Sequence, residues 1–134
     1  MTALIYEQFN PLIDLYTRLL TEKGFEVFAT KSLEEAWGYF QTNDVDLVIA
    51  KFEAVEAHDA PSGVELIRKI RNGDKNSDVF IITIGHEIHR PDEIRLMEMK
   101  VFAMLRLPIT KGAFDSKLDE FFALRNHDGE TNHD

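Results

Sequence analysis

The chain has 134 residues, a formal net charge of −9 and no cysteine. This length fits one domain with a sizeable core. The negative charge opposes binding to nucleic acids or anionic membranes, and the lack of cysteine excludes disulfides and cysteine-ligated zinc. The N-terminus has no signal-peptide pattern, and no apolar run is long enough for membrane insertion, so we expect a cytoplasmic protein.

The first part of the chain alternates short apolar runs with amphipathic segments. Strands are predicted over Ala3–Tyr6, Phe25–Ala29 and Asp46–Ala50. Asn10, which precedes a proline, is predicted to cap the first helix. The capping box Ser32–Glu35 predicts the start of the second helix.

The second part begins with a long acidic loop, Phe52–Ser62, and continues the alternation. Its predicted helices are Val64–Arg71, Pro91–Met99 and a last one marked by Phe114, Leu118, Phe121 and Phe122, and its strands are Val79–Ile84 and Val101–Leu105. The domain is predicted to cover residues 1–124. Residues 125–134 are predicted to form a polar tail or linker.

Five predicted strands alternate with five helices through short connections, which indicates a doubly wound parallel sheet with helices on both faces. Asp46–Phe52 reads D-L-V-I-A-K-F, an apolar run typical of a strand buried on both faces. In such α/β folds ligands bind at the carboxyl ends of the strands. The run places Lys51 at that end, so we expect a lysine at the functional position of the central strand.

Six groups of residues follow one another along Ala3–Leu124: L-I-Y-E-Q-F-N-P-L-I, G-F-E-V-F-A-T with S-L-E-E-A, D-L-V-I-A-K, S-G-V-E-L-I-R-K-I-R, I-I-T-I and L-R-L-P. In order and spacing they resemble the CheY-like receiver domain of bacterial response regulators. The resemblance implies a five-stranded sheet with strand order 2-1-3-4-5 and a role in two-component signal transduction.

Receiver chemistry requires a phosphoacceptor aspartate after the third strand, acids after the first strand that hold Mg²⁺, a hydroxyl ending the fourth strand and a lysine before a proline after the fifth. The resemblance assigns these roles, in the same order, to Lys51, to Glu7 with Gln8, to Thr83 and to Leu107. Of these, Thr83 and, loosely, Glu7 keep the required chemistry.

These replacements predict a degenerate receiver, or pseudo-receiver, that does not carry out phosphotransfer. A lysine cannot form an acyl phosphate, its ammonium does not bind Mg²⁺, and Leu107 cannot pair with a phosphate. Two further departures affect switching. Ile84 replaces the small residue after the hydroxyl position, and Met104 replaces the aromatic switch residue of the fifth strand.

The sequence allows two environments for the Lys51 ammonium group. It can form an internal ion pair with Glu7, since an unpaired buried ammonium would be costly. Alternatively, its stem packs and its head extends to solvent at the mouth of the pocket.

We expect neither a metal site nor an enzyme. Glu53, Glu56, His58 and Asp59 lack a rigid ligand spacing and favour a solvated loop, and H-E-I-H at His86–His89 is one residue short of a zinc signature. The chain has no glycine-rich phosphate loop and no G-x-S-x-G elbow.

A partner surface is predicted on the fourth helix, the fifth strand and the last helix, with Ile94, Met97, Met104 and Arg106 as its candidate residues. Helical periodicity predicts that most of these apolar residues belong to the core. The same elements are the candidate face for a homodimer.

Two functional hypotheses follow. The first is a phosphorylation-independent signalling module that acts through protein–protein contact, as an adaptor or as the N-terminal regulatory domain of a longer protein. The alternative is a small-molecule, anion or nucleotide sensor that uses the modified pocket near Glu7, Lys51 and Thr83. No cofactor is expected.

Overall fold

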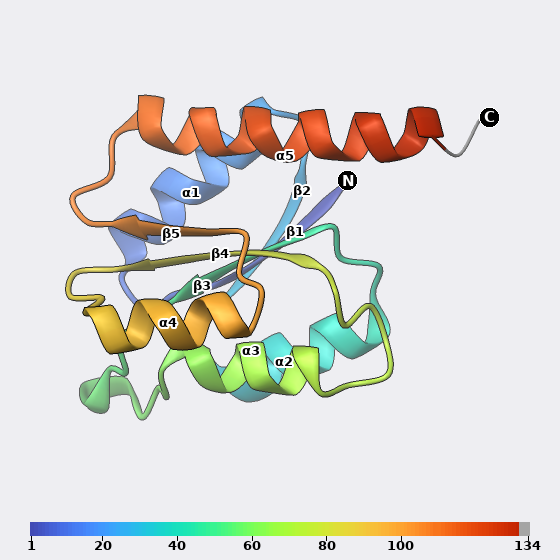
Figure 1. Ribbon diagram of the computed structural model, residues 1–134. Coiled ribbons are helices and arrows are strands. Elements are labelled where there is room, and N and C mark those ends of the chain that lie inside the picture. The colour runs from blue at the N-terminus through green and yellow to red at the C-terminus, as the bar shows by residue number, and fades with distance from the viewer. Residues whose placement is uncertain (132–134) are drawn as a thin grey trace.

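The computed structural model describes residues 1–131 and contains five strands and five helices in alternation (Figure 1). The strands are β1 (Thr2–Tyr6), β2 (Glu26–Thr30), β3 (Leu47–Lys51), β4 (Phe80–Gly85) and β5 (Ala103–Arg106). The helices are α1 (Asn10–Glu22), α2 (Leu33–Thr42), α3 (Gly63–Arg71), α4 (Arg90–Glu98) and α5 (Lys111–Thr131), with a short 3₁₀ helix, η1 (Glu56–His58), before α3.

The strands form one parallel sheet in the order β2-β1-β3-β4-β5, which confirms the predicted fold and strand order. β3 lies at the centre, where Ile49 is level with Ile5 of β1 and Ile82 of β4. Because all strands run in the same direction, their carboxyl ends share one edge of the sheet. Lys51 lies at that edge, as predicted.

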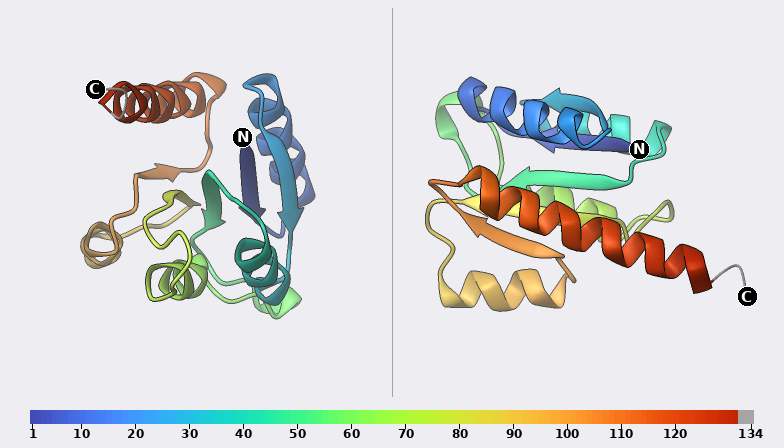
Figure 2. Two further views of the ribbon diagram at one scale, coloured as in Figure 1. Left: turned by 90° about the vertical axis from the view of Figure 1, so that its right-hand side faces the viewer. Right: turned by 90° about the horizontal axis from the view of Figure 1, so that it is seen from above.

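Helices cover both faces of the sheet, with α1 and α5 on one face and α2, α3 and α4 on the other (Figures 1 and 2). Residues of β3 alternate between the two cores. Val48 and Ala50 pack towards α2 and α3, whereas Leu47 and Ile49 pack towards α1 and α5. All four side chains are buried, which explains why β3 is a continuous apolar run.

Serine side chains cap two of the helices. The predicted cap Ser32 is confirmed, because its Oγ accepts a hydrogen bond from the Glu35 N at 3.2 Å. Ser62 caps α3 in the same way, accepting from the Val64 N at 3.1 Å. Both hydroxyls satisfy an N–H group that has no partner within its helix.

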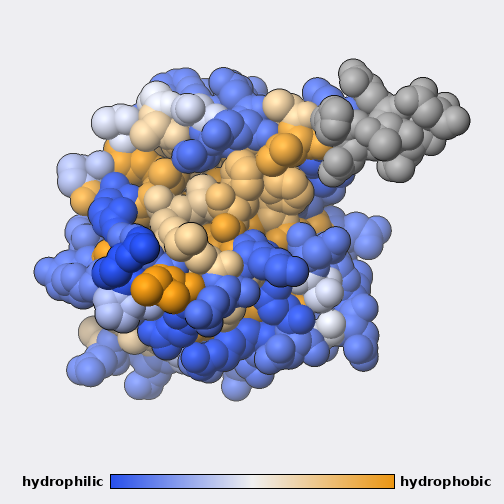
Figure 3. Space-filling view, viewed as in Figure 1, coloured by the Kyte–Doolittle hydropathy of each residue, from blue (hydrophilic) through white to orange (hydrophobic). Residues whose placement is uncertain are grey.

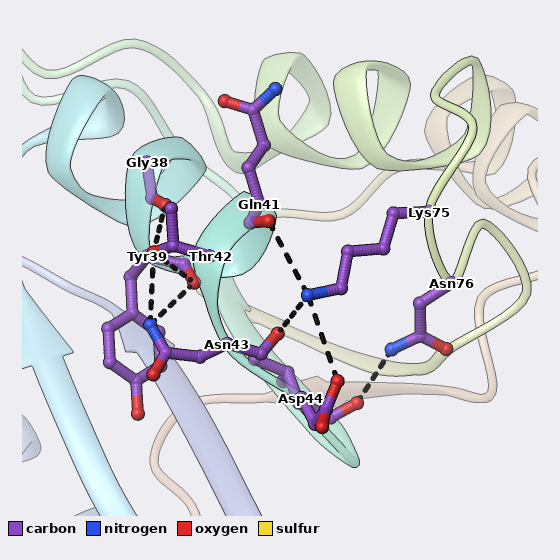
Figure 4. A network of polar contacts seen from close by, with 9 residues as sticks. Gly38, Tyr39, Gln41, Thr42, Asn43, Asp44, Lys75 and Asn76 are labelled. Carbon is purple, nitrogen blue, oxygen red and sulfur yellow. Dashed lines mark hydrogen bonds and ion pairs between the residues drawn. The ribbon is translucent and has the colours of Figure 1, made fainter.

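The loops at the opposite edge of the sheet are joined by side chains from the turn between α3 and β4 (Figure 4). The Lys75 Nζ contacts the Asn43 carbonyl oxygen at 2.9 Å and the Asp44 Oδ1 at 3.7 Å. The Asn76 Nδ2 donates to the Val45 carbonyl oxygen at 2.7 Å. These contacts hold the entry to β3 against the entry to β4.

Helix α5 extends to Thr131, past Leu124, where the sequence predicts the domain to end. Arg125 forms an ion pair with Asp46 at 2.8 Å, and its guanidinium lies over the Phe121 ring at 5.5 Å. The predicted tail therefore begins within α5, and its last residues, 132–134, lie outside the described residues. Within residues 1–131, no helix has the length and apolar character needed to cross a membrane.

Candidate functional site

Lys51 and Glu7 form an ion pair at the carboxyl ends of β3 and β1. The Lys51 Nζ lies 3.5 Å from the Glu7 Oε2, and the two side chains are 11% and 2% exposed. Of the two alternatives for Lys51, the structure contains the internal ion pair. The pairing fits the physics of burial, because an isolated charge at this depth would destabilise the fold strongly.

The Glu7 carboxylate also organises the turn into α1. Its Oε2 accepts hydrogen bonds from the Gln8 N at 2.6 Å and the Phe9 N at 3.0 Å. The prediction that Asn10 caps α1 is wrong, because the cap position is Phe9, whose side chain makes no capping hydrogen bond. A carboxylate just before the helix instead binds the N–H groups that lead into it, where negative charge is favoured.

The other predicted pocket residues lie around this pair but use their polar groups elsewhere. Thr83 is fully buried and donates its hydroxyl to the Ala50 carbonyl oxygen at 3.2 Å. Gln8 donates its Nε2 to the Lys31 carbonyl oxygen at 3.1 Å, whereas its buried Oε1 has no hydrogen-bond partner among the described residues. Leu107 follows β5 and packs against the core beneath α1 and α5.

These side chains do not fit the Mg²⁺ ion that the receiver resemblance implies. Mg²⁺ requires oxygen ligands in near-octahedral geometry. The end of β3 instead presents the Lys51 ammonium, and the Glu7 Oε2 already interacts with two backbone N–H groups and that ammonium. The site therefore contains a cation of its own, which neutralises the nearby carboxylate.

Two tyrosines lie near the pair and stay neutral. Burial, together with the Glu7 charge, raises the pKa of Tyr16, whose hydroxyl has no hydrogen-bond partner in the described part of the chain. The Tyr16 ring stacks on Phe114 with centroids 5.7 Å apart. Burial is also the main cause that raises the pKa of Tyr6, whose hydroxyl donates to the Pro61 carbonyl oxygen at 2.6 Å.

Glu53 joins the loops that follow β3 and β4, a role that the sequence analysis missed. Its carboxylate accepts hydrogen bonds from the His86 N at 3.0 and 3.1 Å and from the Glu87 N at 3.0 Å. A Cβ added to Gly85 would lie 2.7 Å from the Glu53 Oε2, so the glycine permits this close approach. The sequence contains one signal for this contact: the acidic Glu53 follows β3, and Gly85 ends the neighbouring strand β4.

The remaining acidic and histidine residues of these loops do not gather into a metal site. Glu87 and His89 lie 3.8 Å apart with both side chains largely exposed, and His58 is also exposed. Among the side chains that the structure describes, those of residues 1–126, no group of three or more histidine, aspartate or glutamate residues could hold a metal ion.

The predicted partner surface has an exposed apolar part. Ile94 and Met97 of α4 are 45% and 57% exposed, so these two candidate residues lie at the surface and outside the core that periodicity predicts for most of the group. Met104 of β5 is partly buried against the core beneath α2, α3 and α4. Figure 3 shows apolar atoms gathered on the face between α5 and α4, over β5.

Arg106 connects the end of β5 to the start of α4. Its Nη2 donates to the Ile88 carbonyl oxygen at 2.8 Å and pairs with the Glu93 carboxylate. Hydrogen bonds from Arg106 and then from Arg90 hold the pKa of Glu93 below its ordinary value of 4.5. Arg106 thus combines an exposed position with a fixed orientation.

A parallel sheet of this order, with a polar cluster where β1, β3 and β4 end, is the architecture of a receiver domain. A family model described as "Response regulator receiver domain" matches residues 3–119. The chain belongs to this family and is a receiver domain of a signalling protein. Comparison with curated proteins yields no match.

Solved structures share the fold. A CheY-like response regulator receiver domain from Methanospirillum hungatei JF-1 is 14% identical with a TM-score of 0.82, covering 95% of this chain and 97% of that chain. Chemotaxis protein CheY4 from Vibrio cholerae is 15% identical with a TM-score of 0.79, covering 90% and 97%. Response regulator TrrA from Thermotoga maritima, in complex with Mg(2+)-BeF, is 22% identical with a TM-score of 0.72, covering 90% and 97%.

Proposed function

We propose that this receiver domain is a pseudo-receiver, which acts without phosphorylation and signals through protein–protein contact. The observation that carries the proposal is the Lys51–Glu7 ion pair at the end of β3. The ammonium stands where the receiver resemblance requires the phosphoacceptor carboxylate. It can neither form an acyl phosphate nor bind Mg²⁺, so the domain is a binding module rather than an enzyme.

The neighbouring residues support the same proposal. The Thr83 hydroxyl is engaged with the Ala50 carbonyl oxygen, and Leu107 offers no positive charge to a phosphoryl group. Glu53 holds the loop after β4 through backbone hydrogen bonds. We infer that the loops around the site keep one arrangement, which a partner protein recognises constitutively.

The partner surface of the proposal is the face formed by α4, β5 and α5. It combines the exposed Ile94 and Met97 with Arg106, which is held by Glu93 and the Ile88 carbonyl oxygen. Methionine and arginine are both enriched in protein interfaces, and arginine is frequent among the residues that contribute most to binding. The same face is the candidate contact for a homodimer.

Phosphoryl labelling tests the first half of the proposal. The wild-type protein should not be labelled by acetyl phosphate with Mg²⁺, and its thermal transition should not move with beryllofluoride. Lys51→Asp alone should also remain unlabelled, because Gln8 and Leu107 are unchanged. The triple variant Lys51→Asp, Gln8→Asp, Leu107→Lys is the matched comparison that supplies all three missing groups. Efficient labelling of the wild type or of Lys51→Asp would overturn the proposal.

Capture experiments test the second half. A partner retained from the lysate of the source cell by the wild type should be lost with Met97→Glu and with Arg106→Glu. Arg18→Glu, on the exposed side of α1, is the charge-matched control and should retain it. Sedimentation of the same variants tests self-association. Unchanged capture and sedimentation for Met97→Glu and Arg106→Glu would discount this surface.

The alternative function, a small-molecule or anion sensor, is favoured by one observation, the cavity above Lys51. Its lining indicates which ligands it can accept.

A further inference from the structure

A cavity of about 500 Å³ lies above Lys51, among the loops that follow β1, β3 and β4. Its apolar wall is formed by Phe9, Leu12 and Val55, and Phe9 is 57% exposed there although it is a large aromatic residue. Pockets of this size with apolar walls and few polar groups are typical of small-molecule sites. Core packing therefore does not explain the exposed Phe9 ring, whereas Val55 also packs against the core beneath α2, α3 and α4.

The polar part of the lining is free of acidic side chains. The chain contains 24 acidic residues, yet the polar side chains that line the cavity are Lys51, Gln8, His58 and His86. Each of these offers a nitrogen that can donate a hydrogen bond. In a chain with a net charge of −9, this local composition favours an anionic ligand.

Two buried polar groups at the cavity are incompletely satisfied. The Lys51 ammonium has three N–H donors, but among the described residues its one polar contact is the 3.5 Å ion pair with the Glu7 Oε2. That oxygen also accepts two shorter hydrogen bonds from the backbone N–H groups of Gln8 and Phe9. The Gln8 Oε1 is buried without a partner among the described side chains, but as an acceptor it does not itself favour an anion. A ligand that accepts from Lys51 would satisfy donors that the protein leaves open.

The loop after β3 supplies one side of the cavity. Val55 and Ala60 exchange backbone hydrogen bonds of 2.8 and 3.0 Å, which close the loop into a small hairpin around η1. This hairpin carries Val55 and His58 to the cavity. The sequence indicates that the loop Phe52–Ser62 is long, and in the structure part of this loop lines the cavity.

We propose that this cavity binds a small amphipathic anion, with its carboxylate or phosphate head at Lys51 and its apolar body against Phe9, Leu12 and Val55. The head accepts hydrogen bonds from the ammonium, while Glu7 keeps its two backbone donors. This inference goes beyond the proposed function, because it assigns a ligand, and it stands whether or not a protein partner binds the α4–β5–α5 face.

The test uses backbone amide NMR titrations with benzoate and phenyl phosphate as probes. Acetate carries the charge without the apolar body, and benzyl alcohol carries the body without the charge. Benzoate and phenyl phosphate should shift the amides of residues 8–9, 51–58 and 86 at millimolar concentration, and each matched compound should bind more weakly.

Two variants and one control locate the site. Lys51→Met should weaken binding of both anions roughly tenfold or more, because a charge-assisted hydrogen bond is lost. Phe9→Ala changes an exposed side chain, so it should leave folding intact and weaken binding about threefold through lost apolar contact. Leu124→Ala, on α5, also changes an exposed apolar side chain but lies outside the cavity lining, so it should leave binding unchanged.

The proposal is overturned if neither anion shifts these amides, if benzyl alcohol binds as well as benzoate, or if Phe9→Ala binds both probes like the wild type. These readouts involve no phosphoryl transfer, so their failure is distinct from a failure of the labelling experiment.

Discussion

A double-mutant cycle on Lys51 and Glu7 measures what the buried ion pair contributes to the fold. Lys51→Met removes the ammonium and keeps the length of the side chain, and Glu7→Gln removes the charge and keeps an acceptor for the two backbone N–H groups. The double variant removes both charges from the carboxyl edge of the sheet. The measured quantity is the coupling between the two changes in the free energy of unfolding.

The structure sets the magnitude. For two unit charges 3.5 Å apart, an effective dielectric constant of about 20 gives an attraction of about 5 kcal/mol before desolvation is subtracted. Desolvation cancels a large part of this, so we expect a coupling of about 2 kcal/mol. The free energy of unfolding should fall by about 2 kcal/mol in each single variant, because each leaves one buried charge without its partner. In the double variant it should fall by about 2 kcal/mol in total, rather than by the sum of about 4 kcal/mol expected for independent residues.

Urea unfolding followed by the fluorescence of Trp37, the single tryptophan, measures all four proteins. The exposed pair Arg68–Glu65, at 3.1 Å with side chains 47% and 48% exposed, is the control and should couple by less than about 0.5 kcal/mol. Added salt should weaken the control coupling and leave that of Lys51 with Glu7 nearly unchanged. If the two single losses add within about 0.5 kcal/mol, the ion pair does not stabilise the site.

Further predictions concern close packing and titration. Gly63→Ala should destabilise the protein by about 3 kcal/mol, because the new Cβ would lie 2.2 Å from the last carbonyl oxygen of β3. Gly38→Ala, with no atom within 4 Å, should stabilise it by about 0.5–1 kcal/mol, and equal effects in urea unfolding would contradict the packing. Tyr16→Phe should be neutral or stabilising by up to about 1 kcal/mol, because it removes a buried hydroxyl without a described partner. Since the pKa of Tyr16 is raised above 10.0, the wild type should lose stability as the pH rises past 10.0, and the variant should lose less. The pKa of Glu93 is lowered, so its contribution is present above pH 4.5 and lost as the pH falls through the folded value. Carboxyl NMR titration should show Arg106→Gln raising the Glu93 midpoint, and an unchanged midpoint would contradict the pairing.

The sheet could be predicted because its signals are local and repeated. Each buried strand is a short apolar run, and each helix carries an apolar face, so alternation alone indicates a parallel sheet. The resemblance supplied the strand order. The register then brings Glu7, Lys51 and Thr83 to one edge, which is why these residues could be named as one pocket from the sequence.

The rest depends on where side chains point, which a residue pattern does not determine. The partner of Lys51 had two alternatives because its long side chain can reach either Glu7 or solvent. The sequence predicts a solvated loop for Glu53. Its hydrogen-bond donors, the backbone N–H groups of His86 and Glu87, lie in the loop after β4, and no residue pattern links the two loops. Helix α5 continues past Leu124 without an apolar stripe, through contacts that Arg125 makes with Asp46 and Phe121.

The Lys51–Glu7 pair also restricts which sequences can be reached from this one by single substitutions. Lys51→Asp alone would place a second carboxylate beside Glu7 with no cation between them, and Glu7→Lys would place two ammonium groups there. Either first step leaves like charges at a buried edge, which costs stability. A change to an acidic pocket therefore needs coordinated substitutions at several positions. The ion pair makes each of its two residues a constraint on which residue can replace the other.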